Sequence, residues 1–185
     1  AVSGAQDRVL RYWSLSGETI QEMRGHSGTV FCVAVDWTWQ RALSGSWDCT
    51  LRLWDLTRGE TMAELRGHTN AVFCVAADWA SQRAVSGGAD ASVCVWDLRE
   101  GKLLNQLYGH RETITSLDAD WSSKKLLSGS QDGTVLLWDL ETGEKLQSLK
   151  GHLDEVRCAV VRWTVAQQQV VAGSNRAWSS TAVPR

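Results

Sequence analysis

Proline and the smaller aromatic residues are scarce in this sequence. Pro184 is the single proline among 185 residues, and there are two Phe and two Tyr. Tryptophan, by contrast, occurs 11 times. Such an excess of one large aromatic indicates that Trp fills the same structural position repeatedly, so the chain is expected to contain internal repeats.

Long hydrophobic runs and a surplus of positive charge are also absent. No apolar run approaches the roughly 20 residues of a membrane-spanning helix, and residues 1–10 lack the pattern of a secretory signal. The formal net charge of -2 argues against nucleic acid as the main partner, because phosphate binding needs clustered positive charge. The composition, 43% hydrophobic and 22% charged, is that of a globular domain. The start at Ala1 suggests a piece of a longer or processed chain.

The five cysteines show neither metal-binding nor disulfide spacing. No C-x-x-C pair occurs, and each repeat described below holds one His, so we expect no metal site and no cofactor. Cys32, Cys74 and Cys158 share one repeat position and are interpreted as small packed residues. Free thiols favour a reducing, intracellular compartment, so we expect the cytoplasm, with the nucleus as the alternative.

Three separate patterns recur with a period of 42 residues. The dipeptide Gly-His occurs at Gly25-His26, Gly67-His68, Gly109-His110 and Gly151-His152. The dipeptide Trp-Asp occurs at Trp54-Asp55, Trp96-Asp97 and Trp138-Asp139. A Ser-Gly-x-x-Asp pattern runs from Ser44 to Asp48, from Ser86 to Asp90 and from Ser128 to Asp132. Agreement among three patterns establishes a true repeat.

Each repeat reads as four short strands. In residues 25–66, apolar runs begin at Val30, Arg41, Leu51 and Thr61, with turn residues between them. Four strands of this length form one small antiparallel sheet. Such a sheet cannot bury both faces alone, but radial stacking of several copies buries them and limits exposed edges. The sequence therefore predicts an all-β fold, a β-propeller of four-stranded antiparallel blades.

The Gly-His and Trp-Asp patterns resemble those of the WD-repeat family, and the resemblance runs from Ser3 to about Ser174. It implies one WD-repeat domain over residues 1–185. The expected parts are a partial blade (1–24), three full repeats (25–66, 67–108 and 109–150), a degenerate partial repeat (151–175) and a tail (176–185). Because propellers of this family commonly have seven blades, the chain resembles a partial propeller. It either closes as a ring of four blades or forms an open arc with bare faces.

Each full repeat also holds one Ser, one His and one Asp, which are the parts of a nucleophilic triad. A hydrolase needs one such set facing a pocket, and three sets at a fixed step favour a structural role. The resemblance implies a chain of hydrogen bonds in each blade, from Trp to Ser to His to Asp. The expected members are His26, Ser44, Asp48 and Trp54; His68, Ser86, Asp90 and Trp96; and His110, Ser128, Asp132 and Trp138.

The candidate partner-binding residues stand at two positions that differ from repeat to repeat. One lies five residues after each Gly-His histidine, and the other lies just before each tight-turn Asp. The candidates are Phe31, Trp47, Phe73, Gln131 and Arg157. Aromatic residues and Arg most often anchor protein interfaces. Phe31, Trp47 and Phe73 are expected to form one aromatic patch, unless both Phe side chains are buried between blades.

These observations predict a non-catalytic scaffold that holds proteins or peptides on the rim of a propeller, where loops are free to vary. No small-molecule substrate is expected. One alternative is an architectural subunit of a cytoskeletal or regulatory assembly. The remaining alternative, an enzyme built on a propeller, requires a polar constellation that breaks the repeat, and the sequence contains none.

Overall fold

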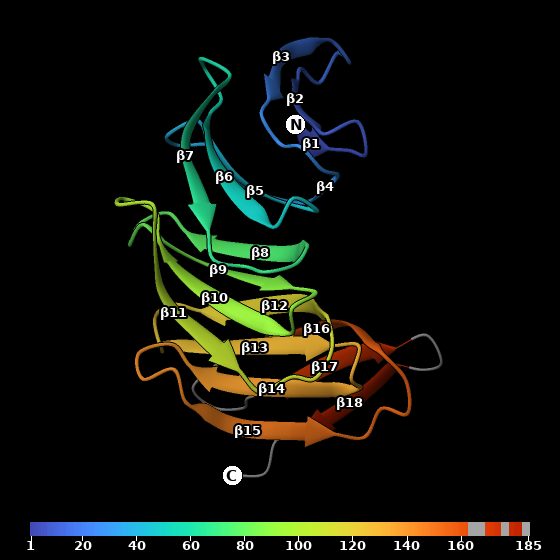
Figure 1. The fold of residues 1–185 in the computed structure, drawn as a ribbon. Helices are drawn as coiled ribbons and strands as arrows, with labels where there is room; N and C mark the ends of the chain where they lie inside the picture. Colours follow the sequence, from blue (N-terminus) through green and yellow to red (C-terminus); the bar gives the residue numbers. More distant parts are fainter. Residues whose placement is uncertain (163–168, 175–177, 183–185) are drawn as a thin grey trace.

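The structure, a computed structural model, describes residues 1–162, 169–174 and 178–182, and every regular element in these ranges is a β-strand. No membrane-crossing helix is present in these ranges. The strands form five separate antiparallel sheets, which follow one another in chain order (Figure 1). The all-β prediction is therefore confirmed.

Three interior sheets have four strands each, in the order in which the chain makes them. The first contains β4 (Val30–Asp36), β5 (Arg41–Ser46), β6 (Thr50–Asp55) and β7 (Glu60–Arg66). The second contains β8 (Val72–Asp78), β9 (Arg83–Gly88), β10 (Ser92–Asp97) and β11 (Lys102–Tyr108). The third contains β12 (Ile114–Asp120), β13 (Lys125–Ser130), β14 (Thr134–Asp139) and β15 (Lys145–Lys150). Four strands per repeat is the arrangement that the apolar runs predict.

The two end sheets have three strands each. The N-terminal sheet contains β1 (Val2–Gly4), β2 (Val9–Trp13) and β3 (Thr19–Arg24). It begins at the second strand of a blade, as the position of Ser3 predicts. The C-terminal sheet contains β16 (Val156–Arg162), β17 (Gln169–Ser174) and β18 (Trp178–Ala182). Here the structure differs from the sequence reading, because β18 lies in the stretch that was assigned to a tail.

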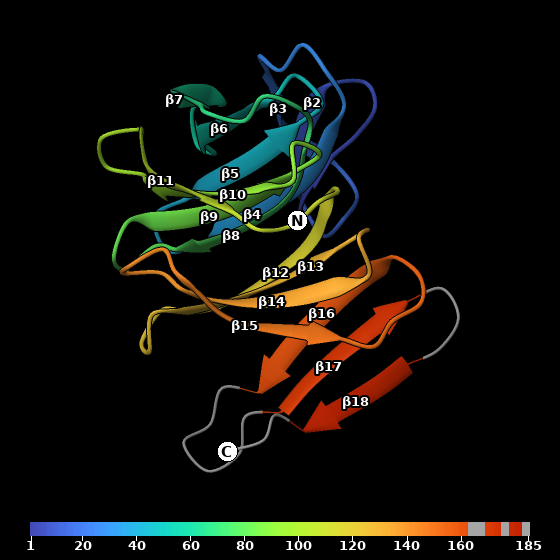
Figure 2. The same cartoon turned by 60° about the horizontal axis from the view of Figure 1, so that its bottom comes forward.

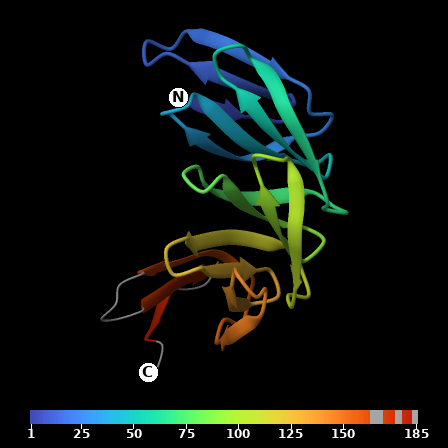
Figure 3. The ribbon, with the colours of Figure 1, turned by 90° about the vertical axis from the view of Figure 1, so that its left-hand side faces the viewer.

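The five sheets stack as an arc with the β1–β3 sheet and the β16–β18 sheet at opposite ends (Figure 3). The first strands β4, β8, β12 and β16 lie next to one another along the inner side of this arc. In the described residues β1 pairs with β2 alone and β16 with β17 alone, so the two end sheets do not join. The closed ring of four blades is therefore not formed, and the fold is a partial propeller, as Figure 2 also shows.

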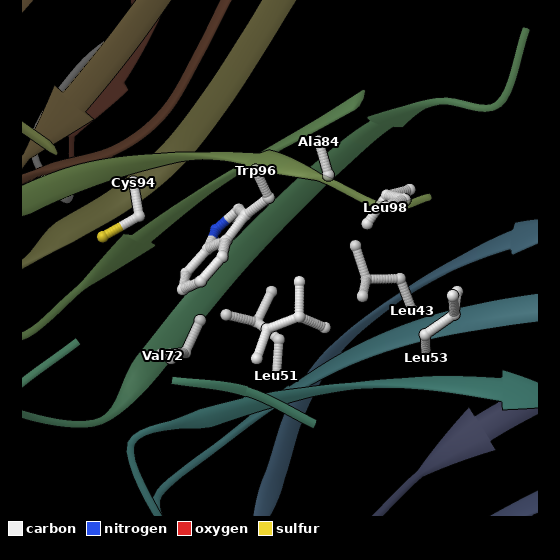
Figure 4. Packing of buried hydrophobic residues seen from close by; sticks show 9 residues of the cluster. Leu43, Leu51, Leu53, Val72, Ala84, Cys94, Trp96 and Leu98 are labelled. Carbon is white, nitrogen blue, oxygen red and sulfur yellow. The ribbon is translucent and has the colours of Figure 1, made fainter. Parts of the chain in front are cut away.

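Apolar side chains fill the space between neighbouring sheets. Between the first two interior sheets, Leu43, Leu51 and Leu53 pack against Ala84 and Trp96 (Figure 4). An equivalent cluster occupies each of the other three junctions. Each interior sheet is thus covered on both faces. Each Å² of apolar surface buried in this way stabilises the fold by about 25 cal/mol.

Candidate functional site

Each interior sheet holds a chain of polar side chains that come from its second and third strands, the turn between them and the loop before its first strand. In the first interior sheet, Nε1 of Trp54 donates to Oγ of Ser44 over 2.8 Å. Oγ of Ser44 lies 2.8 Å from Nε2 of His26, and Nδ1 of His26 lies 2.8 Å from Oδ2 of Asp48. With Trp donating to the Ser oxygen, the hydroxyl proton is free to go to His26, whose own N–H then donates to the carboxylate.

The same chain recurs in the other two interior sheets. In the second, the successive distances from Trp96 to Ser86, to His68 and to Asp90 are 2.8, 2.7 and 2.9 Å. In the third, those from Trp138 to Ser128, to His110 and to Asp132 are 2.8, 2.7 and 3.0 Å. All twelve residues that the sequence singled out thus lie in three equivalent clusters.

A fifth member of each cluster was missed in the sequence analysis. The hydroxyl of Thr50 donates to Oδ1 of Asp48 over 2.7 Å, and Ser92 does the same to Asp90 over 2.8 Å. Thr134 holds the equivalent position in the third sheet. The signal was present, because a Ser or Thr stands two residues after each tight-turn Asp.

The order Ser, His, Asp matches that of a catalytic triad, but the serine hydroxyls are buried away from solvent. Ser44, Ser86 and Ser128 are each 0% exposed. The indole N–H of the neighbouring Trp also donates to one of the two lone pairs of each Ser oxygen. A substrate has no route to these oxygens, so the arrangement ties strands together rather than attacking a bond.

Burial and hydrogen bonding set the charge of each cluster. Burial lowers the pKa of His26 and of His110 below the ordinary value, although the Asp partner acts in the opposite direction. Burial disfavours ionisation of Asp48, yet hydrogen bonds from Thr50 and His26 outweigh this effect and place its pKa at about 2. At neutral pH the clusters of His26 and His110 therefore pair a neutral imidazole with a carboxylate.

The two end sheets hold incomplete versions of the chain. In the N-terminal sheet Trp13 donates to Ser3 over 2.8 Å, while Asp7 pairs with Arg11 in place of a His. In the C-terminal sheet Ala172 pairs with Ala159, which is the register position that Ser44 holds opposite Val33. Without a Ser at this position the Trp-to-Asp chain does not form there.

The three aromatic candidates lie in contact at one end of the first two interior sheets. The rings of Phe31 and Phe73 stack with centroids 4.6 Å apart, and those of Phe31 and Trp47 are 6.0 Å apart. Trp47 is 60% exposed and Phe31 39%, while Phe73 is half-buried. We call these three side chains the aromatic patch. They are not buried between blades.

Backbone contacts fix Trp47 in place. Its N–H donates to the carbonyl of Thr29 over 2.8 Å, which joins the tight turn to the Gly-His loop. Gly28 makes this approach possible, since an added Cβ there would lie 2.9 Å from Cβ of Trp47. The backbone that carries the exposed indole is held in place, because the next residue, Asp48, is hydrogen-bonded to His26.

The two polar candidates lie together at the other end of the arc. Gln131 donates to Glu155 over 3.2 Å, and Arg157 pairs with the same carboxylate over 2.6 Å. Thr115, at the position of Phe31 in its own repeat, bonds to the carbonyl of Val156 over 2.5 Å. The structure therefore divides the five candidates into the aromatic patch and a separate polar cluster of Gln131, Glu155 and Arg157.

No group of three or more potential metal ligands is present in the ranges that the structure describes. Its five cysteines are free and lie on different strands and turns. Burial raises the pKa of Cys32 and Cys94 to about 12, so both stay protonated thiols. The hydrogen-bonded polar clusters are therefore buried, and the side chains open to contact lie on the rim formed by the loops and turns.

Consecutive four-stranded antiparallel sheets, each with its own Trp–Ser–His–Asp chain, define a repeat protein of the β-propeller class. The family model for WD40 (WD domain, G-beta repeat) matches residues 17–55, 59–97 and 101–139, which together make up more than half of the chain. The chain belongs to the WD40 repeat family, and the resemblance that the sequence suggested is confirmed.

Relatives are similar to short parts of this chain. Eukaryotic translation initiation factor 3 subunit I from Xenopus laevis is 48% identical over 52 residues, 28% of this chain and 16% of the relative. The human protein of the same name is 42% identical over 52 residues, again 28% and 16%. Small ribosomal subunit protein RACK1 from Dictyostelium discoideum is 39% identical over 64 residues, 31% of this chain and 20% of the relative. The chain therefore spans a fifth or less of these relatives.

Proposed function

We propose that this chain is a non-catalytic scaffold that holds other proteins or peptides on the rim that carries the Gly-His loops and the tight turns. The aromatic patch carries this proposal. Exposed aromatic side chains on a rigid base are the residues that most often anchor protein interfaces, since they lose little conformational freedom on binding. The rim also varies from repeat to repeat while the buried clusters do not.

Burial of the polar clusters supports the absence of catalysis. The three Ser-His-Asp sets repeat at a fixed step, and all three serine hydroxyls lie out of reach of solvent. The net charge of -2 favours a protein over a nucleic acid as the partner. We therefore assign the clusters to stability and the rim to recognition, with no small-molecule substrate and no cofactor.

The relatives support a setting for this scaffold. One group is named as a subunit of a translation initiation factor, and another as a protein of the small ribosomal subunit. We propose that this chain works in a translation-related protein assembly, in the cytoplasm. The aromatic patch would be the part that contacts its neighbour in that assembly.

The test is binding of the purified chain to purified translation initiation factor 3 and to purified small ribosomal subunits. Trp47→Ala should weaken the interaction by about tenfold or more, as loss of a central aromatic anchor does. Trp39→Ala is the matched control, because Trp39 is 71% exposed but lies in the loop between β4 and β5, at the opposite end of the strands.

Three results would count against the proposal. Equal binding by the Trp47→Ala chain and the unmodified chain would rule out the aromatic patch as the anchor. An equal loss with Trp39→Ala would show that the effect is not specific to this rim. Absence of binding to both assemblies would rule out the translation setting.

A further inference from the structure

A pocket of about 420 Å³ lies between the second and third interior sheets, at the end of the strands opposite the Gly-His loops. Its lining includes the loop between β8 and β9, the loop between β12 and β13 and the turn after β14. Buried Val95 and Leu140 supply apolar surface, and Trp121 is half-buried. Both sheets are covered on both faces, so the pocket belongs to the interior of the arc.

The equivalent place between the first two interior sheets is filled by an arginine of the chain itself. Trp79 stands there at the repeat position of Trp121. The guanidinium of Arg41 lies 5.5 Å from the ring centroid of Trp79. It donates to Oε1 of Gln82 over 2.9 Å and to Oδ2 of Asp36 over 3.1 Å. At this junction a cation is therefore held against an aromatic ring by one amide and one carboxylate.

Two changes of residue leave the same place open between the second and third interior sheets. Val95 stands at the position of Leu53, and Lys124 stands at the position of Gln82. Valine is smaller than leucine, and a lysine cannot accept a hydrogen bond from an arginine. Arg83, at the position of the stacked arginine, is exposed. In the described part of the chain its side chain makes no hydrogen bond, no ion pair and no ring contact.

Two carboxylates that line the pocket are without a cationic partner. Asp78 stands at the position of Asp36, and it accepts the N–H of Ala80 over 3.1 Å. Glu141 is exposed and stands where the preceding repeat has Arg99. Within the ranges that the structure describes, neither carboxylate forms an ion pair. Both are therefore available to a positively charged group that enters the pocket.

The two cations that line the pocket act on other acids. Backbone hydrogen bonds, first of all from the N–H of Glu100, lower the pKa of Asp97, and the charge of Arg83 adds to this effect. In the same way, backbone hydrogen bonds lower the pKa of Asp139, and the charge of Lys124 adds to it. The cations thus lie near carboxylates that do not line the pocket.

We infer that this pocket binds an arginine side chain of a partner protein, with its guanidinium against the ring of Trp121 and paired with Asp78 and Glu141. The charged lining residues are two acids and two bases, so charge alone does not select the ligand. The ring selects it, because an aromatic face attracts cations and not carboxylates. A planar guanidinium both stacks on a ring and pairs with a carboxylate.

The site lies at the opposite rim from the aromatic patch, so the inference does not rest on the proposed function. The test uses the full chain and a short peptide with one arginine among glycines. NMR titration follows the indole N–H signals, and the signal of Trp121 is the one that Trp121→Phe removes. The arginine peptide should shift this signal to saturation. The same peptide with citrulline should bind about tenfold or more weakly, because citrulline keeps the shape and lacks the charge.

Two variants at exposed positions test the assignment of the lining residues. Glu141→Gln should weaken binding of the arginine peptide by about threefold, because it removes one of the two carboxylate charges. Glu112→Gln is the matched control, since Glu112 is exposed in a Gly-His loop at the other end of the strands. Thermal unfolding checks that both variants keep the fold.

Lys124→Gln tests why the pocket is open. Lys124 and Gln82 share a φ of 57°, so glutamine fits the backbone at this position. The new glutamine should hold Arg83 against Trp121, as Gln82 holds the arginine of the preceding sheet. Binding of the arginine peptide should weaken by about threefold or more, because the open form becomes a minor one.

The contrary outcomes overturn the inference. Equal binding of the arginine and citrulline peptides shows that the pocket does not recognise the charge. Stronger binding of a peptide with glutamate in place of arginine shows that the pocket takes a carboxylate. A Trp121 signal that the arginine peptide leaves unchanged up to millimolar concentration shows that the pocket is not an arginine site. An equal loss with Glu141→Gln and Glu112→Gln shows that the overall charge of the chain, and not this pocket, attracts the peptide.

Discussion

The indole nitrogen of Trp96 donates a hydrogen bond to Oγ of Ser86 over 2.8 Å, and both side chains are 0% exposed. This contact joins the second and third strands of a sheet through their side chains. Oγ of Ser86 also lies 2.7 Å from Nε2 of His68, and because this oxygen is fully buried no substrate can reach it. A residue that looks like a nucleophile in the sequence is a structural connector in the fold.

Ser86→Ala should lower the free energy of unfolding by about 1–3 kcal/mol, because the buried indole N–H of Trp96 loses its acceptor. Urea denaturation followed by Trp fluorescence measures this change. Ser81→Ala, at an exposed position before β9, is the control and should leave stability unchanged. A fluorophosphonate probe should not label the unmodified chain, and labelling that Ser86→Ala abolishes would contradict the structural role.

Asp90→Ala should lower the melting temperature more than any rim substitution. The carboxylate accepts hydrogen bonds from Nδ1 of His68, the N–H of Thr69 and the hydroxyl of Ser92, so its loss leaves several donors without a partner. The expected cost is about 2–4 kcal/mol, from more than one unsatisfied group. Asp97→Ala removes a half-buried carboxylate that accepts only two N–H groups of the turn after β10, so it should cost less. Equal melting temperatures for the two variants would disprove the assignment.

Stability should fall as the pH is lowered. Burial holds the pKa of His26 and His110 below the ordinary 6.5, so below that pH the unfolded chain binds protons that the folded chain does not. The free energy of unfolding therefore begins to decline below pH 6.5. A second decline should follow between pH 3.8 and about 2, because Asp48 and Asp90 have a pKa of about 2 in the fold against an ordinary 3.8.

Urea denaturation at a series of pH values measures this profile. His110→Gln should flatten the first decline, because one of the histidines that carry it is removed. A free energy of unfolding that rises between pH 7 and pH 5 would contradict the assignment of neutral, buried imidazoles.

Exchanging glycine and alanine at the same position of the tight turn should change stability in a predictable direction in two repeats. Gly133 has φ of 76° and Ala91, at the equivalent position, has φ of 59°. Gly133→Ala should destabilise the chain by about 1 kcal/mol, because a left-handed backbone strains an L side chain. An added Cβ at Gly133 would also lie 3.3 Å from the carbonyl oxygen of His152.

Ala91→Gly should be neutral or stabilising, because relief of strain offsets the greater freedom of glycine in the unfolded chain. Thermal unfolding of both variants checks the two signs. A stabilising Gly133→Ala would show that the left-handed turn is not under strain.

Much of the fold was predictable because the local sequence pattern of each repeat specifies its strands and turns. The strands of residues 25–66 begin within one residue of the expected starts, since alternating apolar residues and turn signals act over a few residues. The polar clusters were also anticipated, because His26, Ser44 and Asp48 recur with the period and the resemblance to the WD-repeat family implies that they are hydrogen-bonded. Ser92 and its equivalents were missed because their hydroxyls join the network only when the turn brings them to the Asp.

Whether the three aromatic side chains form an exposed patch could be decided only from the structure. Phe31 and Phe73 lie 42 residues apart in the sequence, and either burial or exposure fitted their position. Their stacking at 4.6 Å follows from the placement of β4 beside β8, which belong to different sheets. Likewise β18 lies in a stretch with no family pattern, where pairing with β17 defines the strand.

By itself, the sequence determined the repeat, the four strands of each interior sheet and the residues of each polar cluster, because all of these depend on local patterns. Only the tertiary structure decided that the arc stays open and which apolar side chains meet solvent. Leu15 and Leu56 hold equivalent positions, yet the first is 99% exposed and the second 1%. Burial of these Leu side chains depends on whether a neighbouring sheet covers them, and the sequence pattern within one repeat does not contain that information.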